Sequence, residues 1–342
     1  MRAPQTDGWT RRRFLGGLAL AGTAGLLGLH PKTVAAEPPP ETTTLKLVKT
    51  PGICGIAPLV VAEELFKTEG FTEVQYVQKT TVAESYAAMA AGELHMNTQA
   101  IGGTVLLQLD AGAPVVVLAG VHVGCYELFA TEQIRTVGEL KGKTISLGEL
   151  RSGRQAFLVT VLTHVGLTPH KDVNVVVQPP TQAMQLLADR QIDAFVGFPP
   201  EPQELRAQHI GHVLVNSTLD RPWSYYFCCM IVANQAFVRR HPVATKRAVR
   251  AILKAGDICA REPERAARVL VDQGYTARYD VALQTLQELP YAKWREYDPE
   301  DSVRFYALRL HEAGMITSTP QKLIAQHTDW RFVNELKKEL KG

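Results

Sequence analysis

Two stretches of this sequence follow the same order of helix, turn and strand. The first reads MAAGELHMN and the second LADRQIDAF. Gly70 lies 22 residues before the turn at Gly92, and Gly166 lies 23 residues before the corresponding turn residue, Asp189. Alternating strands and helices are typical of a parallel sheet with crossover helices. Any such protein repeats strand–helix–strand units, but the matched spacing favours two similar α/β lobes.

Hydrophobic periodicity and the positions of glycine and proline locate the individual elements. The expected strands are 45–48, 74–77, 94–96, 115–119, 144–147, 173–177, 192–196 and 225–232. The expected helices begin near residues 58, 82, 102, 153, 181, 242 and 263. Proline suits the first turn of a helix, as at the last two of these positions. The C-terminal third is therefore predicted to be helical.

The same pattern predicts how the chain divides into domains. We expect lobe 1 to comprise 45–126 and, after the chain returns, 219–342, with lobe 2 formed by 127–218. Residues 37–44 contain three consecutive prolines and are typical of an extended linker. The chain beyond residue 36 is longer than a single hydrophobic core usually covers, which also favours two lobes.

The N-terminal segment 1–36 has the layout of an export signal. Three arginines in TRRRFL precede an uncharged apolar run, 14–29, that is shorter than the roughly 20 residues of a membrane-spanning helix. Small residues at Val34-Ala35-Ala36 fit a cleavage site, and the arginines resemble a twin-arginine signal. An ordinary secretory signal is the alternative. The twin-arginine interpretation predicts that the Tat export machinery is a partner and that the mature protein is soluble and periplasmic.

Charge and cysteine content narrow the possible partners. Residues 1–36 hold five of the 37 basic residues and one of the 34 acidic residues. Residues 37–342 therefore contain 32 basic and 33 acidic residues, a net charge of −1. A chain without excess positive charge is not expected to bind nucleic acid. The spacing of the five cysteines matches no zinc motif. We therefore expect no cofactor and no metal ion.

The segment Ala233–Val271 resembles the C-terminal part of substrate-binding proteins of nitrate/sulfonate/taurine-type ABC importers. The matching features are Phe237 with Pro242 before a long helix, and Pro263-Glu264 at the start of the next. The turns at 90–94 and 191–194 also resemble that family, with the resemblance extending over roughly 45–275. His95 departs from it, because the family usually carries aspartate there.

The resemblance implies an α/β fold of the periplasmic-binding-protein type II class, with two lobes, a ligand cleft between them and a helical C-terminal extension. It also implies an ABC transporter permease, with its ATPase, as partner. The expected ligand is a small organic or oxyanionic solute such as a sulfonate, nitrate or taurine. A pyrimidine precursor of thiamine is an alternative ligand, and a ligand-sensing domain is an alternative role.

Candidate ligand-binding residues lie in loops expected at the carboxyl ends of strands, where open α/β sheets bind ligands. They are Cys54, Gly55, Asn97, Thr98, Gln99, Cys125, Ser152, Gly153, Arg154, Phe198, Glu201 and Tyr225. Ser152 has the alternative role of capping the next helix. Glu201 is expected either to hold a cationic group of the ligand or to be a solvated surface acid.

Adjacent cysteines at 228 and 229, in YYFCCMIV, suit a buried strand because cysteine behaves as a small hydrophobe. The rival hypothesis is an exported metal-dependent enzyme that uses this pair together with His122 and Cys125. The sequence contains no nucleophile elbow, P-loop or His-Glu-x-x-His helix. We therefore expect a binding protein without catalytic residues.

Overall fold

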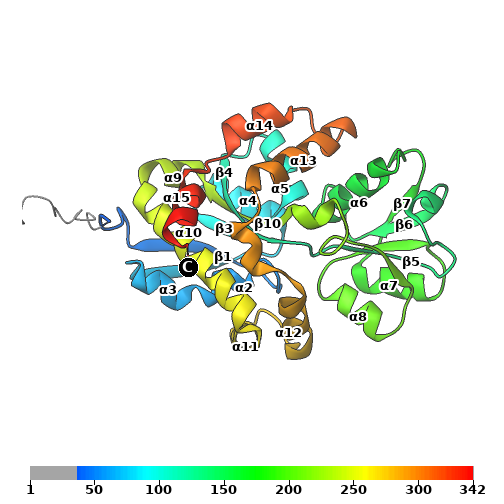
Figure 1. Ribbon diagram of the computed structural model, residues 1–342, viewed down its shortest axis with the longest axis horizontal. Helices are drawn as coiled ribbons and strands as arrows, with labels where there is room; N and C mark the ends of the chain where they lie inside the picture. The colour runs from blue at the N-terminus through cyan, green and yellow to red at the C-terminus, as the bar shows by residue number, and fades with distance from the viewer. Residues whose placement is uncertain (1–36, 342) are drawn as a thin grey trace, which may run out of the picture. The chain divides into compact units, whose positions relative to one another are not determined.

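The computed structural model describes residues 37–341 (Figure 1). The predicted twin-arginine signal and its cleavage site lie outside these residues. The first sheet has the strand order β2-β1-β3-β10-β4, in which β1 is parallel to β2 and β3, and β10 is antiparallel to β3 and β4. Its strands are β1 (Thr44–Lys49), β2 (Glu73–Gln78), β3 (Met96–Ile101), β4 (Val115–Val123) and β10 (Phe227–Asn234). Strand β10 and the edge strand β4 are buried along their whole length.

The second sheet repeats this topology in the order β7-β6-β8-β5-β9. Its strands are β5 (Glu127–Ala130), β6 (Thr144–Leu147), β7 (Asn174–Val177), β8 (Ala194–Gly197) and β9 (His212–Asn216). Strand β5 is antiparallel to β8 and β9 and takes the place that β10 has in the first sheet. The two α/β lobes predicted from the doubled pattern are confirmed.

Helices connect the parallel strands of each sheet. Those of the first sheet are α2 (Ala57–Val61), α3 (Glu63–Thr68), α4 (Val82–Ala90) and α5 (Gly102–Asp110). Those of the second are α6 (Gly153–His164), α7 (Pro180–Ala188) and α8 (Glu201–Ala207). Thr81 begins α4 with a capping box, in which its side chain accepts from the Glu84 N–H and the Glu84 carboxylate accepts from the Thr81 N–H.

The doubled sequence motif corresponds to two equivalent pairs of hydrogen bonds, called turn locks here, which join a turn to β1 in the first sheet and a turn to β6 in the second. In the first, His95 N donates to Lys46 O at 2.8 Å, and His95 Nδ1 accepts from Lys46 N at 3.2 Å. In the second, Asp193 N donates to Thr144 O at 2.9 Å, and Asp193 Oδ2 accepts from Thr144 N at 2.8 Å. The histidine that departs from the resembling family therefore makes the same contact as the aspartate.

Several predicted boundaries differ from the structure, and three of these differences matter for the site. The helix expected from Pro58 is divided at Ala62 into α2 and α3. Strand β3 begins at Met96 instead of ending there, so that 97–99 belong to the strand and not to a loop after it. Strand β10 begins at Phe227, whose N–H donates to Ser302 Oγ at 2.8 Å, a tertiary contact without a local sequence signal.

The C-terminal third is helical, as predicted. It comprises α9 (Gln235–Arg240), α10 (Pro242–Arg261), α11 (Pro263–Asp272), α12 (Tyr279–Glu288), α13 (Pro299–Glu312), α14 (Pro320–His327) and α15 (Arg331–Glu339). Proline occupies the first turn of α10, α11, α13 and α14. Within residues 37–341, every helix is too short or too polar to cross a lipid bilayer.

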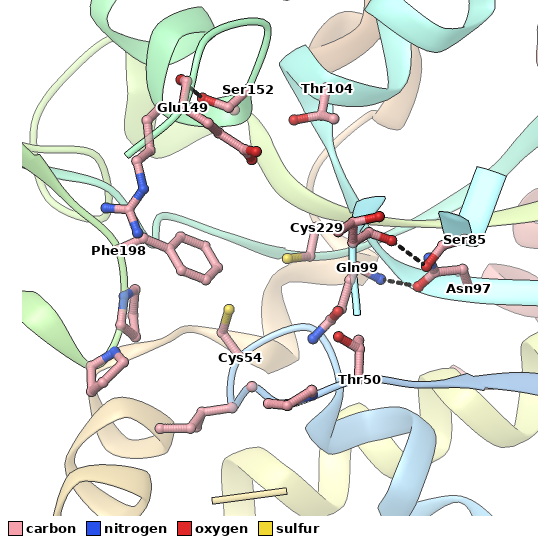
Figure 2. A pocket seen from close by; sticks show the side chains of 18 of the residues that line it. Thr50, Cys54, Ser85, Asn97, Gln99, Thr104, Glu149, Ser152, Phe198 and Cys229 are labelled. Atoms are coloured by element: carbon pink, nitrogen blue, oxygen red, sulfur yellow. Dashed lines mark hydrogen bonds between the residues drawn. The ribbon is translucent and has the colours of Figure 1, made fainter. Parts of the chain in front are cut away.

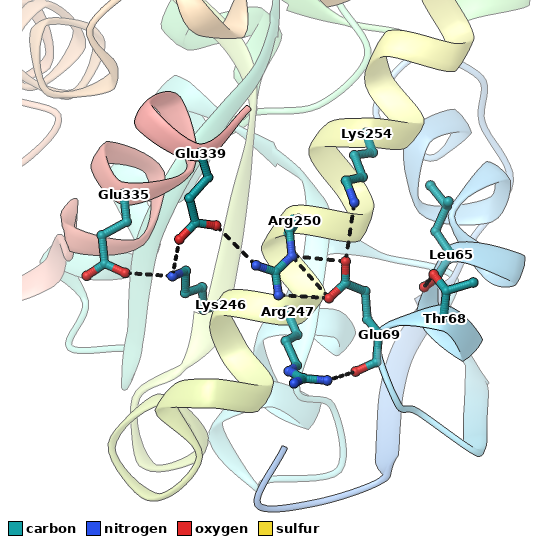
Figure 3. Close-up of polar contacts among 9 residues, drawn as sticks. All are labelled: Leu65, Thr68, Glu69, Lys246, Arg247, Arg250, Lys254, Glu335 and Glu339. Atoms are coloured by element: carbon teal, nitrogen blue, oxygen red, sulfur yellow. Dashed lines mark hydrogen bonds and ion pairs between the residues drawn. The ribbon is translucent and has the colours of Figure 1, made fainter. Parts of the chain in front are cut away.

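A buried carboxylate ties these C-terminal helices to the first sheet (Figure 3). Glu69, which follows α3, accepts from Arg250 Nε at 2.9 Å and lies 3.5 Å from Lys254 Nζ. Arg250 also contacts Glu339 of α15 at 3.1 Å. One carboxylate and one guanidinium thus connect α3, α10 and α15.

The linker expected at 37–44 has no regular structure before β1, but it contacts the folded chain. The Glu41 carboxylate accepts from Val243 N and Ala244 N, both at 2.9 Å, at the start of α10. Burial acts to raise the pKa of Glu41, but these backbone hydrogen bonds outweigh burial and leave the pKa lowered. Glu41 therefore caps a helix that is distant in sequence.

Candidate functional site

A cavity of about 570 Å³ is lined by residues that follow strands of both sheets (Figure 2). Most of the predicted ligand-binding residues line it: Cys54, Asn97, Gln99, Ser152, Gly153, Arg154, Phe198 and Glu201. Gly55, Thr98 and Cys125 are buried and are not among the lining residues. The cavity therefore brings together loops from both halves of the chain, at the carboxyl ends of parallel strands.

Tyr225 does not reach this cavity. Its side chain is 40% exposed and lies in the short 3-10 helix η2 (Trp223–Tyr225), before β10 begins. The ring packs edge-on against Tyr297, with centroids 5.9 Å apart, and the Arg221 guanidinium lies 4.9 Å from its centre. The sequence analysis began a strand at Tyr225, whereas the structure places this residue in η2, where its ring packs against Tyr297 outside the cavity lining.

The first sheet contributes uncharged polar groups from β3. Asn97 Oδ1 accepts from Gln99 N at 2.7 Å, which fixes the backbone in the first half of the strand. Gln99 is half-buried and lines the cavity. A Cβ at Gly52 would lie 2.7 Å from Gln99 Nε2, so the glycine makes room for this amide. Gln99 can therefore donate to a solute and accept from it.

The second sheet contributes the start of α6. Ser152 caps this helix, since its Oγ accepts from Gln155 N at 3.4 Å and donates to Glu149 O at 2.8 Å. Capping was the alternative role predicted for this residue, and it is confirmed. The N–H groups of Gly153 and Arg154, in the first turn, have no intrahelical acceptor. Such a helix start favours an anionic group of a ligand.

Arg154 and Glu201 form a bidentate ion pair at the cavity wall. The hydrogen bonds run from Arg154 Nη1 to Glu201 Oε2 at 2.6 Å and from Nη2 to Oε1 at 2.8 Å. Arg154 Nη1 also donates to Val196 O at 2.7 Å, and Glu201 Oε2 accepts from Phe198 N at 2.9 Å. The side chains are only 14% and 12% exposed. Glu201 is thus not a solvated surface acid, because its carboxylate is half of a nearly buried ion pair.

Sequence reasoning missed several lining residues. They are Thr50, Pro51, Thr80, Thr81, Ser85, Tyr86, Thr104, Glu149, Cys229, Tyr275 and Thr276, whereas the lining residues Gly52, Ile53, Tyr126, Pro199 and Pro200 belong to segments that the sequence already placed at the cleft. Tyr86 is 3% exposed, and its hydroxyl has no hydrogen-bond partner within the described residues. Burial raises the pKa of Tyr86, so the phenol stays protonated. The polar run Thr80-Thr81 after β2 was the available signal, because it also follows a parallel strand.

Glu149 carries the remaining charge of the cavity lining. It is exposed, and within residues 37–341 no ion pair or hydrogen bond of its carboxylate is recorded. The other charged lining residues, Arg154 and Glu201, neutralise each other. The aromatic part of the wall comes from Phe198 and Tyr126, whose ring centroids are 5.3 Å apart. The cavity is therefore polar, carries one unpaired carboxylate and has an aromatic side.

A cluster of sulfur and imidazole groups lies at the cavity floor. The donor atoms of Cys54, His122, Cys125 and Cys229 all lie within 4.8 Å of one another, and all four residues are buried. Burial alone would lower the pKa of His122, but the Cys229 and Cys54 thiols outweigh burial and raise it to about 10. Cys228 is buried but is not a member of the cluster. Of the four residues considered from sequence, His122, Cys125 and Cys229 belong to the cluster and Cys228 does not, while Cys54 was not expected there.

The two α/β lobes with a cavity between their sheets define the class of the fold, which solved structures share. The nitrate-binding protein NrtA from Synechocystis PCC 6803 matches with a TM-score of 0.73 and 15% identity, over 89% of this chain and 90% of that one. The aliphatic sulphonate binding protein SsuA from Escherichia coli matches with a TM-score of 0.67 and 16% identity, over 81% of this chain and 90% of that one. The desulfurization enzyme DSZB matches with a TM-score of 0.61 and 16% identity, over 86% of this chain and 99% of that one. These similarities confirm the predicted periplasmic-binding-protein fold.

A family model assigns the chain more narrowly. The NMT1-like family matches residues 38–271, more than half of the sequence, and the protein belongs to this family. Among curated protein sequences, none matches the chain. Binding proteins and an enzyme both occur among the structures that share the fold, so the fold alone does not decide between binding and catalysis.

Proposed function

We propose that this protein is the substrate-binding component of an ABC importer, and that it captures a small organic or oxyanionic solute in the periplasm. The cavity between the two sheets carries this proposal, because hydrogen-bonding groups from both lobes converge on it. The nitrate-binding and sulphonate-binding proteins with the same fold support it. The predicted export signal supports an extracytoplasmic location, with Tat machinery, permease and ATPase as partners.

The charges of the cavity narrow the expected solute. Arg154 is engaged by Glu201 and Val196, so no free cationic side chain lines the cavity among the described residues. The start of α6 can accept an anionic group, and Glu149 can accept an amine. We therefore infer that a solute with both groups, as in taurine, binds better than a simple anion. Nitrate and alkanesulfonates are then the weaker ligands.

Binding without chemical change is the second part of this proposal. Among residues 37–341, the cavity lining brings together no nucleophile and general base apart from the buried cysteine–histidine cluster. Because the fold also occurs in a desulfurization enzyme, turnover has to be measured directly. A solute that is bound and released unchanged is the expected result.

A thermal-shift and calorimetry panel tests this function. The solutes are taurine, its hydroxyl analogue 2-hydroxyethanesulfonate, a simple alkanesulfonate, nitrate and an aminopyrimidine. A ligand present at a hundred times its Kd stabilises the folded state by about 2.7 kcal/mol. We expect taurine to bind more tightly than its hydroxyl analogue, and Glu149→Gln to remove that difference. No binding across the panel, together with consumption of any compound, would contradict the proposal.

A further inference from the structure

The four buried donors at the cavity floor come from three separate segments. Cys54 lies in the loop between β1 and α2, His122 and Cys125 lie at the end of β4 and in the crossing to β5, and Cys229 lies in β10. None is more than 4% exposed. We propose that Cys54, His122, Cys125 and Cys229 together bind one soft transition-metal ion of the kind that prefers thiolate and imidazole ligands, zinc(II) or copper(I).

The size of the cluster fits such an ion. A zinc ion in a tetrahedral site has bonds of about 2.3 Å to sulfur and about 2.0 Å to nitrogen, which places neighbouring donor atoms roughly 3.5–3.8 Å apart. Cys125 Sγ lies 3.8 Å from each ring nitrogen of His122, and no pair of donor atoms in the cluster is separated by more than 4.8 Å. Movements of about 1 Å would complete the site, and three thiolates with one imidazole is a known zinc donor set.

The imidazole is already oriented for this role. His122 Nδ1 lies 3.0 Å from Val123 O, a carbonyl that can only accept, so this nitrogen donates and Nε2 is the ring nitrogen that would give up its proton to bind an ion. The Tyr291 ring packs edge-on against the imidazole with centroids 4.9 Å apart, and the Tyr291 hydroxyl donates to Cys54 O at 2.7 Å. Metal-bound histidines usually donate their second N–H to such an acceptor. Tyr291 holds two of the four ligands in place.

The backbone at Cys125 adds an independent observation. Its φ is +91°, a left-handed conformation that is unfavourable for a residue with a side chain. Gly124 before it has φ +90°, and a Cβ there would lie 2.1 Å from Thr218 Oγ1. The turn directs the Cys125 sulfur back to His122, three residues earlier. Strain of this kind is typical of functional positions, and glycine would remove it if no thiol were needed.

An ion can reach the cluster from the cavity. Cys54 and Cys229 line the cavity, and Figure 2 shows their sulfur atoms facing the same space. A Cβ at Gly55 would lie 3.0 Å from Cys229 Sγ, so the glycine leaves this sulfur its room. The bound ion would join the first strand, the crossing to the second lobe and the returning strand. This proposal does not depend on which solute the cavity holds.

Metal content and optical spectra test the proposal. The purified protein, reduced and under anaerobic conditions, is incubated with zinc(II) or with copper(I), desalted and analysed by elemental mass spectrometry. We expect one ion per chain from at least one of the two metals. Replacement by cobalt(II) is expected to give the sulfur-to-cobalt charge-transfer bands and the visible bands of a tetrahedral thiolate site.

Matched variants separate this site from adventitious binding. Cys229→Ser and, as a second variant on the cavity side, Cys54→Ser are expected to lose the ion and the cobalt spectrum. Cys259→Ser removes an equally buried thiol that is outside the cluster, and it is expected to retain both. Circular dichroism shows which variants fold. The proposal is overturned if the wild-type protein retains no ion, if Cys229→Ser and Cys54→Ser retain as much as Cys259→Ser, or if thiol titration finds a disulfide among the four cysteines.

Discussion

The two lobes of this protein have the same strand order, but the side chains at equivalent positions beside the cavity differ in chemical type. After the first parallel strand, lobe 1 presents the Cys54 thiol, whereas lobe 2 presents the Arg154 guanidinium at the start of α6. At the third strand of each sheet, lobe 1 presents the Gln99 amide, whereas lobe 2 presents Glu201. Arg154 and Glu201 of lobe 2 pair with each other, while the Gln99 amide of lobe 1 remains open to the cavity. The shared topology therefore provides positions, and the side chains decide what each position does.

The largest predicted effect concerns the ion pair of lobe 2. In Glu201→Gln the buried Arg154 loses its charged partner, and we expect the free energy of unfolding to fall by about 3 kcal/mol. Denaturant unfolding measures this loss. Glu262→Gln removes a carboxylate from an exposed pair with Arg265 and is expected to leave stability unchanged. Equal effects for the two variants would show that Arg154 and Glu201 have no special structural role.

The corresponding position of lobe 1 is expected to act on binding instead of folding. Gln99→Ala removes an amide whose side chain makes no recorded hydrogen bond within residues 37–341. We expect about tenfold weaker solute binding by calorimetry, equivalent to about 1.4 kcal/mol, with an unchanged melting temperature. Gln191→Ala, in an exposed turn of lobe 2, is the control and is expected to change neither. A destabilised Gln99→Ala protein with normal affinity would reverse the assignment.

The smallest effect concerns the two turn locks. Burial, with Lys46 nearby, lowers the pKa of His95 from 6.5 to about 4. Between these values the unfolded chain binds a proton that the folded protein does not, so stability falls as the pH falls from 6.5 toward 4. Because His95 is partly exposed, we expect a loss of about 1 kcal/mol between pH 7 and pH 5.

His95→Asn keeps a hydrogen-bond acceptor that does not titrate, and it is expected to reduce this dependence on pH. Asp193→Asn changes the equivalent turn of lobe 2 and leaves His95 in place, so this variant is expected to retain the pH dependence of stability of the wild-type protein. Urea unfolding at several pH values measures both. If His95→Asn loses stability on acidification as steeply as the wild-type protein, the neutral imidazole is not the source of the effect.

Local sequence patterns were sufficient to predict the lobes but not the contacts between distant residues. The repeated turns at Gly92 and Asp189 predicted two similar sheets, because helix ends and strands have local signals. The pair Arg154–Glu201 joins residues 47 apart, and the start of β10 depends on a bond from Phe227 to Ser302. Such contacts are set by tertiary packing. Cys54 and Cys229 likewise meet only after the chain has crossed to lobe 2 and returned.

The central claim is that one solute is held by both lobes at once. Calorimetric titration of the tightest-binding solute of the panel into the wild-type protein, Gln99→Ala and Glu149→Gln tests it most directly, since the two variants alter opposite sides of the cavity. We predict one solute per chain in all three proteins, with weaker binding in each variant. Undiminished affinity in either variant would contradict a site shared between the lobes.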